Sequence, residues 1–242
     1  MNPGKEARAL KQTLIALLRR LGDVLLDLLY PERAACLCCD RALGEDEQDG
    51  LCPACVRALE RLELRQQERE AQGEMEPLPP GIAYVHAAYP YTGQVRTLIL
   101  KLKFERLREA AEPLARAMAT LPAGEEELIV PVPTTKRRLR ERGFNQAQVL
   151  CALLAGAWGM PMEEALTRED DRTAQSRLGG QSRRANLTGC MRALPVVAGR
   201  RVLLVDDVYT TGSTAAEAAR ALMEAGAAGV GVITAARTEF GP

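Results

Sequence analysis

The sequence predicts an α/β fold with a small metal-binding module on its N-terminal side. The clearest sign of the α/β part is the run Val-Leu-Leu-Val at 202–205, which is typical of a strand buried on both faces. The Ala-rich segment 215–225 follows and predicts a helix that Gly226 ends. Apolar runs at 128–133 and 229–235 predict two further strands. Two C-x-x-C pairs near the N-terminus indicate the metal-binding module.

Composition supports a folded core and argues against two classes of protein. Of the 242 residues, 47% are hydrophobic and 26% are charged, so a sizeable core is available. Lysine plus arginine and aspartate plus glutamate number 32 each, so the chain lacks the basic excess of a dedicated nucleic-acid binder. No apolar run approaches the ~20 residues that a membrane span needs, and no signal peptide is recognisable. Seven cysteines without an export signal predict a reducing compartment, the cytoplasm.

The first predicted element is an amphipathic helix over residues 9–30, which Pro31 ends. Its leucines recur at alternating spacings of three and four, as one face of a helix requires. The plainer interpretation is a helix that packs on the rest of the chain or on a partner. Because the segment also carries Lys11, Arg19 and Arg20, a helix lying on a membrane surface is the alternative.

The cysteine module follows this helix. Cys36 with Cys39 and Cys52 with Cys55 form two C-x-x-C pairs that twelve residues separate, a spacing that lets four thiolates close around Zn²⁺. The segment has almost no apolar core of its own, so the metal would supply its folding free energy. Unliganded thiols and a redox C-x-x-C are the alternatives. Cys38 is surplus to the four-ligand set.

A linker separates this module from the α/β part. Residues 56–72 are charged and look helical, and residues 73–81, rich in glycine and proline, predict the linker. Residues 83–89 then predict a strand that contains His86, the only histidine, for which a structural role is expected rather than ligation or base catalysis. The predicted parts are residues 1–72 (N-terminal helix and four-cysteine zinc module), 73–81 (linker) and 82–242 (the α/β domain).

The middle of the chain predicts helices. Residues 95–120 are helix-rich, and Pro113 marks a helix start or kink. Lys101 and Lys103 lie on different faces of this segment, and solvated side chains are the default expectation for both. Residues 149–158 predict another helix.

Two arginine-rich segments carry phosphate-binding chemistry. Residues 136–142 hold five basic residues in seven positions; they would receive pyrophosphate, face solvent, or touch nucleic-acid phosphates. The polar, glycine-containing segment 167–186 predicts either a loop that closes over a polyphosphate or a disordered surface loop. Four arginines of that second segment would close over the polyphosphate: Arg172, Arg177, Arg183 and Arg184.

The residues after the strand at 202–205 form the most informative stretch. Asp206 and Asp207 suit the vicinal hydroxyls of a ribose, or Mg²⁺ with its water shell. The five residues that follow at the start of the helix present hydroxyls and backbone amides to an anion: Thr210, Thr211, Gly212, Ser213 and Thr214. Carboxylates beside a phosphate cradle fit a ribose 5-phosphate, whereas a solvated acidic turn is the alternative. Residues 202–214 resemble the phosphoribosyl-pyrophosphate (PRPP) motif of type I phosphoribosyltransferases.

Over nearly its whole length the chain resembles the ComF family of bacteria. The resemblance implies a type I phosphoribosyltransferase fold, with a central parallel sheet flanked by helices, behind a zinc-ribbon-like module. It also implies a cytoplasmic role in natural transformation, in which single-stranded DNA is handled with a helicase partner. Asp40, where the family often has glycine, and the extra Cys38 are departures that remove no zinc ligand. The matching motifs are the cysteine pairs, Tyr91-Thr92-Gly93, Leu102-Lys103-Phe104, Val130-Pro131-Val132-Pro133, Arg142-Gly143-Phe144-Asn145-Gln146, Arg172-Thr173 with Gln175, Arg184 with Asn186, and the Asp-Asp loop.

The function that follows is a PRPP-dependent transferase, or a protein that retains its PRPP site, linked to DNA uptake. Asp206 and Asp207 would hold the ribose hydroxyls and orient Mg²⁺, and residues 210–214 would hold the 5-phosphate. Four cations would neutralise the departing pyrophosphate: Lys136, Arg142, Arg172 and Arg184. The alternative is a non-catalytic adaptor whose zinc module and basic segments bind single-stranded DNA or a helicase.

Overall fold

The computed structural model describes residues 35–44, 50–73, 77–169 and 189–238. The chain divides into two compact units, Met1–Cys52 and Pro53–Pro242, and each is considered by itself. The predicted helix over residues 9–30 lies outside the described residues, as do Arg172 and Arg184. Within the described part of the chain, no helix has both the length and the apolar character that crossing a bilayer requires.

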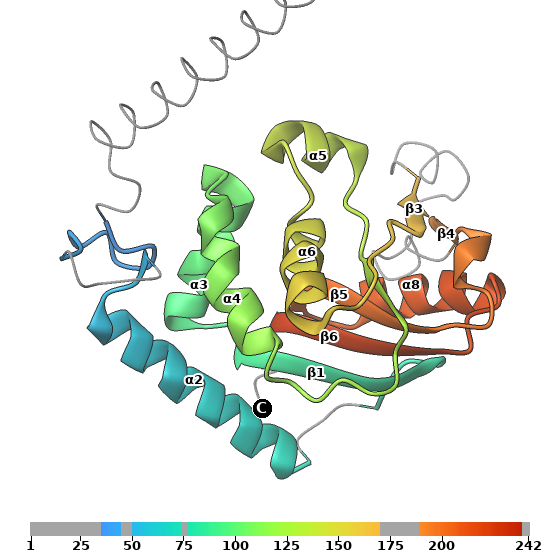
Figure 1. The fold of residues 1–242 in the computed structure, drawn as a ribbon, viewed down its shortest axis with the longest axis horizontal. Helices are drawn as coiled ribbons and strands as arrows, with labels where there is room; N and C mark the ends of the chain where they lie inside the picture. Colours follow the sequence, from blue (N-terminus) through green and yellow to red (C-terminus); the bar gives the residue numbers. More distant parts are fainter. Residues whose placement is uncertain (1–34, 45–49, 74–76, 170–188, 239–242) are drawn as a thin grey trace, which may run out of the picture. The chain divides into compact units, whose positions relative to one another are not determined.

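The second unit is built on a sheet of four parallel strands in the order β1-β6-β5-β2 (Figure 1). This arrangement confirms the predicted parallel sheet with helices. The strands are β1 (Ile82–Pro90), β2 (Leu128–Pro131), β5 (Arg201–Tyr209) and β6 (Gly229–Arg237). β5 is a central strand, and Val202 to Val205 are fully buried, as expected for a strand covered on both faces.

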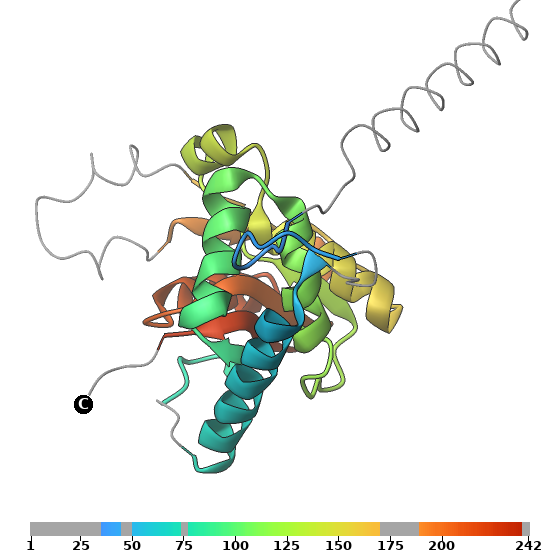
Figure 2. The same cartoon turned by 90° about the vertical axis from the view of Figure 1, so that its left-hand side faces the viewer.

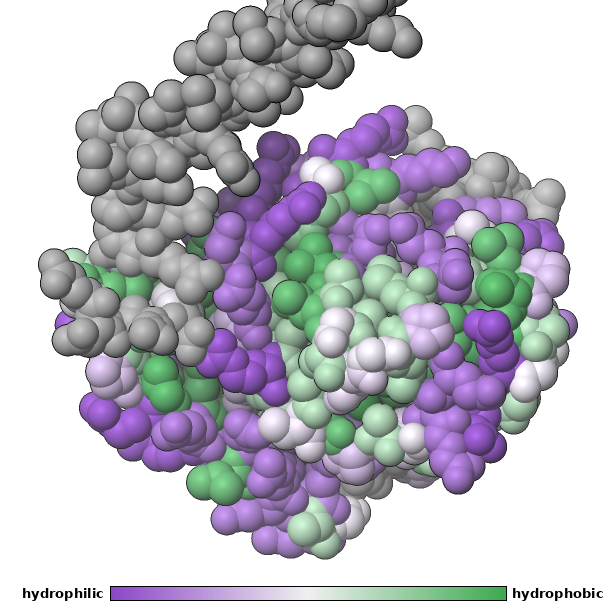
Figure 3. All heavy atoms as spheres, viewed as in Figure 1, coloured by the Kyte–Doolittle hydropathy of each residue, from purple (hydrophilic) through white to green (hydrophobic). Residues whose placement is uncertain are grey.

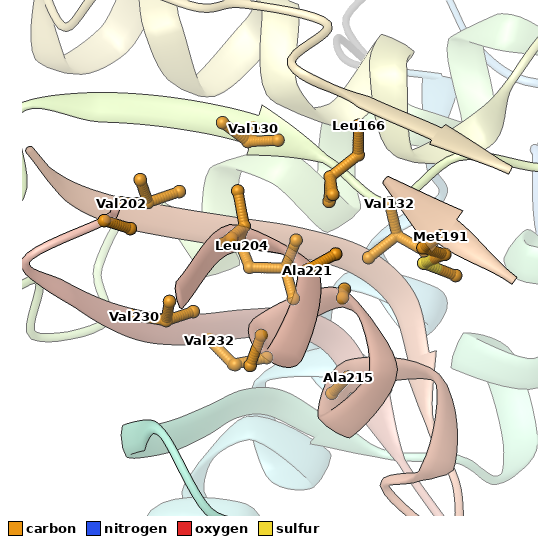
Figure 4. Packing of buried hydrophobic residues seen from close by; sticks show 14 of the residues in the cluster. Val130, Val132, Leu166, Met191, Val202, Leu204, Ala215, Ala221, Val230 and Val232 are labelled. Atoms are coloured by element: carbon orange, nitrogen blue, oxygen red, sulfur yellow. The ribbon is translucent and has the colours of Figure 1, made fainter. Parts of the chain in front are cut away.

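Alternation along β5 separates two apolar layers. Val202 and Leu204 join a cluster with the alanine face of α8 (Ser213–Glu224), as Figure 4 shows. Because side chains alternate along a strand, Leu203 and Val205 point to the opposite face. There α6 (Gln146–Trp158) contacts β2 and β5, and α4 (Ala111–Met118) contacts β1 and β6.

The strand that carries the acidic pair is longer than predicted. β5 continues through Asp206 and Asp207 to Tyr209, which pairs with Arg237 of β6, so the aspartates belong to the strand and do not follow it. β2 stops pairing with β5 at Val205. The two carboxylates therefore lie beyond the last residue of β2, at the carboxyl edge of the sheet, where ligands bind in open α/β sheets.

A long helix, α2 (Pro53–Ala71), contacts β1 at the edge of the sheet and is the blue-to-teal helix of Figure 2. Its Glu70 accepts a hydrogen bond from the backbone N–H of Ala87, at 3.1 Å. A second Glu70 oxygen lies 3.0 Å from Nδ1 of His86. The single histidine therefore joins a helix to a strand.

The remaining elements of this unit were predicted unevenly. Pro113 lies in the first turn of α4, as expected. The short antiparallel pair β3 (Leu166–Arg168) and β4 (Met191–Ala193), which is packed against α8, was not predicted. The basic run forms a short helix, α5 (Lys136–Arg142), whose first turn is capped by the Thr135 hydroxyl. The helix α3 (Gly93–Leu100) continues directly into a π-helix, η2 (Lys101–Glu105).

Candidate functional site

The turn from β5 into α8 has the geometry of an anion cradle. Gly212 precedes α8 with φ of 70°, a conformation that favours glycine, and a side chain here would overlap the ring of Tyr209. The first amides of α8 point out of the helix end, where the helix dipole favours a negative charge. The hydroxyls of Thr211 and Ser213 lie 2.8 Å apart beside them.

The acidic pair is partly enclosed and electrostatically coupled. The Asp207 side chain is mostly buried, and its backbone N–H donates to Oδ1 of Asp206 at 2.8 Å. Burial, and then the neighbouring charge of Asp207, raise the pKa of Asp206 to about 7, although Lys103 opposes the shift. Two such carboxylates therefore favour the approach of a cation, which would let both ionise.

A pocket of about 490 Å³ opens at this edge of the sheet. Of the predicted ligands of PRPP, five line it: Asp206, Asp207, Thr210, Thr214 and Arg142. A smaller cavity beside it shares Asp206, Thr210 and Thr214 and is also lined by Gly212.

Three predicted ligands line neither cavity. Lys136, Thr211 and Ser213 are absent from both linings, and Lys136 is exposed at the start of α5. The roles of these three residues, like those of Arg172 and Arg184, stay predictions.

Three arginines supply positive charge to the pocket. Arg142 donates from Nη1 to Oε1 of Gln146 at 2.8 Å, and burial together with the charge of Arg138 lowers its pKa from the usual value. Arg138 and Arg168 line the same pocket, although the sequence did not single them out. The surface over α5 is largely hydrophilic (Figure 3), which suits a helix that presents guanidinium groups to an anion.

The π-helix η2 brings two further residues to the pocket. Nζ of Lys103 lies 3.0 Å from Oδ1 of Asp207, and Phe104 forms part of the pocket wall. The default expectation of two solvated lysines is wrong, because Lys101 is also buried. π-helical turns recur at functional sites, but their hydrogen-bond pattern leaves no mark on hydrophobic spacing. The resemblance to the ComF family included Lys103 and Phe104 without assigning them a role.

The four predicted zinc ligands lie together. The sulfur atoms of Cys36, Cys39, Cys52 and Cys55 are within 4.8 Å of one another, and the sulfurs of Cys39 and Cys52 are 3.7 Å apart. That distance is close to the edge of a tetrahedron with a centre ~2.3 Å from each sulfur, the bond length of zinc thiolates. The donor set therefore fits Zn²⁺. Burial acts to raise the pKa of Cys36, but hydrogen bonds to its sulfur, above all from the backbone N–H of Cys52 at 3.4 Å, outweigh it and lower that pKa.

Comparison with known proteins defines the class of the α/β domain. The family model of the phosphoribosyl transferase domain matches residues 159–239, which include β5, the cradle and α8. The parallel sheet and the carboxylates at its edge agree with that class.

Comparison with curated proteins defines the family. The chain is 34% identical over 212 residues to the DNA utilization protein YhgH of Escherichia coli (strain K12), covering 84% of this chain and 90% of that protein. It is 28% identical over 148 residues to the competence protein ComFC of Bacillus subtilis (strain 168), covering 59% of each. It is 37% identical over 105 residues to the competence protein F of Haemophilus influenzae, covering 41% of this chain and 45% of that protein. The chain belongs to the ComF family, within the phosphoribosyltransferase superfamily.

Proposed function

We propose that the pocket binds PRPP together with Mg²⁺. The observation that carries this proposal is that one pocket is lined by Asp206 and Asp207, by Thr210 and Thr214 from the turn into α8, and by Arg138 and Arg142. The carboxylates suit the ribose hydroxyls and a hydrated magnesium ion. The start of α8 suits the 5-phosphate, and the arginines suit the pyrophosphate.

The reaction that this site supports is displacement of pyrophosphate from the ribose carbon by an acceptor nucleophile. As the carbon–oxygen bond to pyrophosphate breaks, positive charge develops on the ribose ring. The negative charges of Asp206 and Asp207 stabilise that positive charge. Arg138 and Arg142 bind and orient the leaving pyrophosphate, whose charge they reduce. Bound Mg²⁺ would neutralise further oxygen charge on the same group.

Isothermal titration of the full chain with PRPP, with and without Mg²⁺, tests the binding. We expect saturable heat that depends on the cation, and ribose 5-phosphate should bind more weakly because it lacks the pyrophosphate. No heat at millimolar PRPP from a protein with a cooperative unfolding transition would reject the proposal.

We also propose that the four cysteines hold a structural zinc ion, supported by the tetrahedral fit of their sulfurs. Replacing Cys52 and Cys55 with serine should abolish the expected ~1 zinc per chain, measured by elemental mass spectrometry, and lower solubility. Cys38→Ser is the matched control: this buried neighbour lies outside the ligand set, so the variant should retain its zinc. Equal zinc content in all three proteins would contradict the assignment.

The family supports a role in DNA use. The relatives are called DNA utilization and competence proteins, and we propose that this chain also acts in DNA uptake, in the cytoplasm. A non-catalytic adaptor is the second candidate, favoured by the exposed cations of α5. Mobility shifts with single-stranded DNA and a pull-down of a competence helicase test it, and silence in both assays would count against it.

A further inference from the structure

Phe104 is an apolar side chain placed in a polar pocket. The residue is 68% exposed, the largest value among the exposed large hydrophobic residues of the described part of the chain. The ring belongs to the wall of the same pocket as Asp206 and Arg142. Single exposed apolar residues are common on protein surfaces, but an aromatic ring in the wall of a charged pocket presents a flat apolar face to a ligand.

The segment that carries this ring is anchored on both sides of Phe104. Phe104 lies in η2, which is followed by Arg106 with φ of 58°, a left-handed conformation that a residue other than glycine rarely adopts. Arg106 donates from Nη2 to the backbone oxygen of Glu141 in α5, at 3.0 Å, so η2 is tied to the helix that also contributes Arg138 and Arg142 to the pocket. The neighbouring Lys103 is anchored on Asp207. These contacts anchor the segment that carries Phe104 beside the carboxylates.

A cation already covers part of the ring. The guanidinium carbon of Arg142 lies 5.4 Å from the centroid of the Phe104 ring, a cation–π distance. Because the residue is still 68% exposed, this contact leaves the ring accessible to a ligand. The chain contains a useful contrast in Arg108 and Phe144, which are 4.7 Å apart in the same kind of pair, but that ring is buried and does not line the pocket.

We propose that Phe104 is a stacking platform for a purine or pyrimidine ring, with Arg142 at its rim. The inference rests on the proposed function, since it names the kind of ring that would bind beside PRPP. Aromatic side chains stack on any nucleobase because every base has a π-face, and a nearby guanidinium strengthens the contact. The same ring chemistry could come from a free base or from a base of single-stranded DNA.

Fluorescence of 2-aminopurine, free or within a short single-stranded oligonucleotide, tests the proposal on the full chain with PRPP and Mg²⁺ present. Stacking on Phe104 should quench the probe. Phe104→Leu should weaken binding of the probe about ten-fold or more, and Phe104→Trp should restore it. Leu139→Ala is the matched control, because Leu139 is also an exposed apolar residue, 42% exposed, but does not line the pocket. That variant should bind like the unsubstituted protein.

Two comparisons identify the source of the ring and the cause of the effect. Quenching of free 2-aminopurine would indicate a free base, and quenching only within the oligonucleotide would indicate a strand. An oligonucleotide with an abasic site at the probed position keeps its phosphates, so its binding should not change in Phe104→Leu. An equal loss for the abasic strand, or probe binding that is unchanged in Phe104→Leu, would overturn the inference.

The inference and the proposed function fail in different ways. PRPP affinity, measured by titration, should stay within about two-fold of the unsubstituted value in Phe104→Leu, because stacking involves the base and not the sugar phosphate. If the unsubstituted protein binds PRPP but neither probe, the stacking proposal fails and the PRPP proposal stands. If the probe binds through Phe104 but PRPP does not bind, the proposed function fails and the ring site remains.

Discussion

The two sides of the pocket are built in different ways. One side, from Asp206 to Thr214, is a continuous stretch that runs from β5 into α8. The other side joins η2 to α5, which lie more than thirty residues apart, and contributes Lys103, Phe104, Arg138 and Arg142. The continuous side has a geometry that local sequence determines, whereas the assembled side depends on the whole fold. The two sides should therefore respond differently to substitution.

The largest effect is expected on the continuous side. Asp206→Asn together with Asp207→Asn keeps the shape of both side chains but removes the charges that suit the ribose hydroxyls and magnesium. We expect PRPP affinity to fall by about 100-fold or more, in line with the loss of several charge-assisted hydrogen bonds. Titration calorimetry measures the change, and the zinc content, which we propose depends on the four cysteines, should stay the same. PRPP affinity within a few-fold of the unsubstituted value would show that the two carboxylates do not contribute to PRPP binding.

The same difference explains how much the sequence could predict. The cradle could be recognised because Asp206, Asp207 and Gly212 are neighbours in the chain and each has a local reason to be there. The cysteine set could also be recognised, because ligand spacing within each pair is a local property. The length of β5 could not, because its last residues are in the strand only through pairing with β6 as far as Arg237. Two aspartates after an apolar run do not by themselves predict that the strand continues.

Apart from Arg142, the assembled side was missed for a physical reason. Lys103 pairs with Asp207 across more than one hundred residues of sequence, and nothing near Lys103 in the chain signals that partner. Arg138 and Arg168 likewise reach the pocket only once α5 and β3 are placed. A charged run such as 136–142 looks the same whether it faces solvent or a ligand. Tertiary placement, and not residue type, distinguishes the two cases.

The next effect tests the assembled side directly. Lys103→Met should lower the free energy of unfolding by about 2 kcal/mol, because it leaves the mostly buried Asp207 without its partner. Urea unfolding measures the loss. Arg137→Ala is the matched control: Arg137 pairs with Glu141 at 2.7 Å, but both side chains are exposed, so the change should be about 0.5 kcal/mol or less.

Magnesium sharpens this test. If Asp207 accepts a divalent cation, Mg²⁺ should stabilise Lys103→Met more than the unsubstituted protein, because the cation then supplies the missing positive charge. Equal stabilisation of the two proteins would indicate that the ion pair is structural and separate from cation binding. Lys103 would then stabilise the assembled side of the pocket without taking part in ligand binding.

The smallest effect concerns the strand pair behind the cradle. Glu217 of α8 is buried, accepts from the backbone N–H of Met191 at 2.9 Å, and is paired with Arg220 at 2.8 Å. Burial acts to raise the pKa of Glu217, but the bonds from Arg220 and Met191 outweigh it, so the pKa lies below the ordinary value of 4.5. Its stabilising effect is therefore full above pH 4.5 and is lost as the pH falls through the lower folded-state pKa.

Glu217→Gln should consequently reduce unfolding free energy by about 1–2 kcal/mol at neutral pH, because it weakens hydrogen bonds to a charged group. Urea unfolding at several pH values should show this difference shrinking below pH 4.5, where the unsubstituted protein loses the same charge. Glu224→Gln is the control, since Glu224 pairs with the same Arg220 but its side chain is 65% exposed. A pH-independent difference would mean that packing of Glu217, and not its charge, joins β4 to the helix of the cradle. The helix that completes the continuous side of the pocket would then be held against β4 by packing and not by charge.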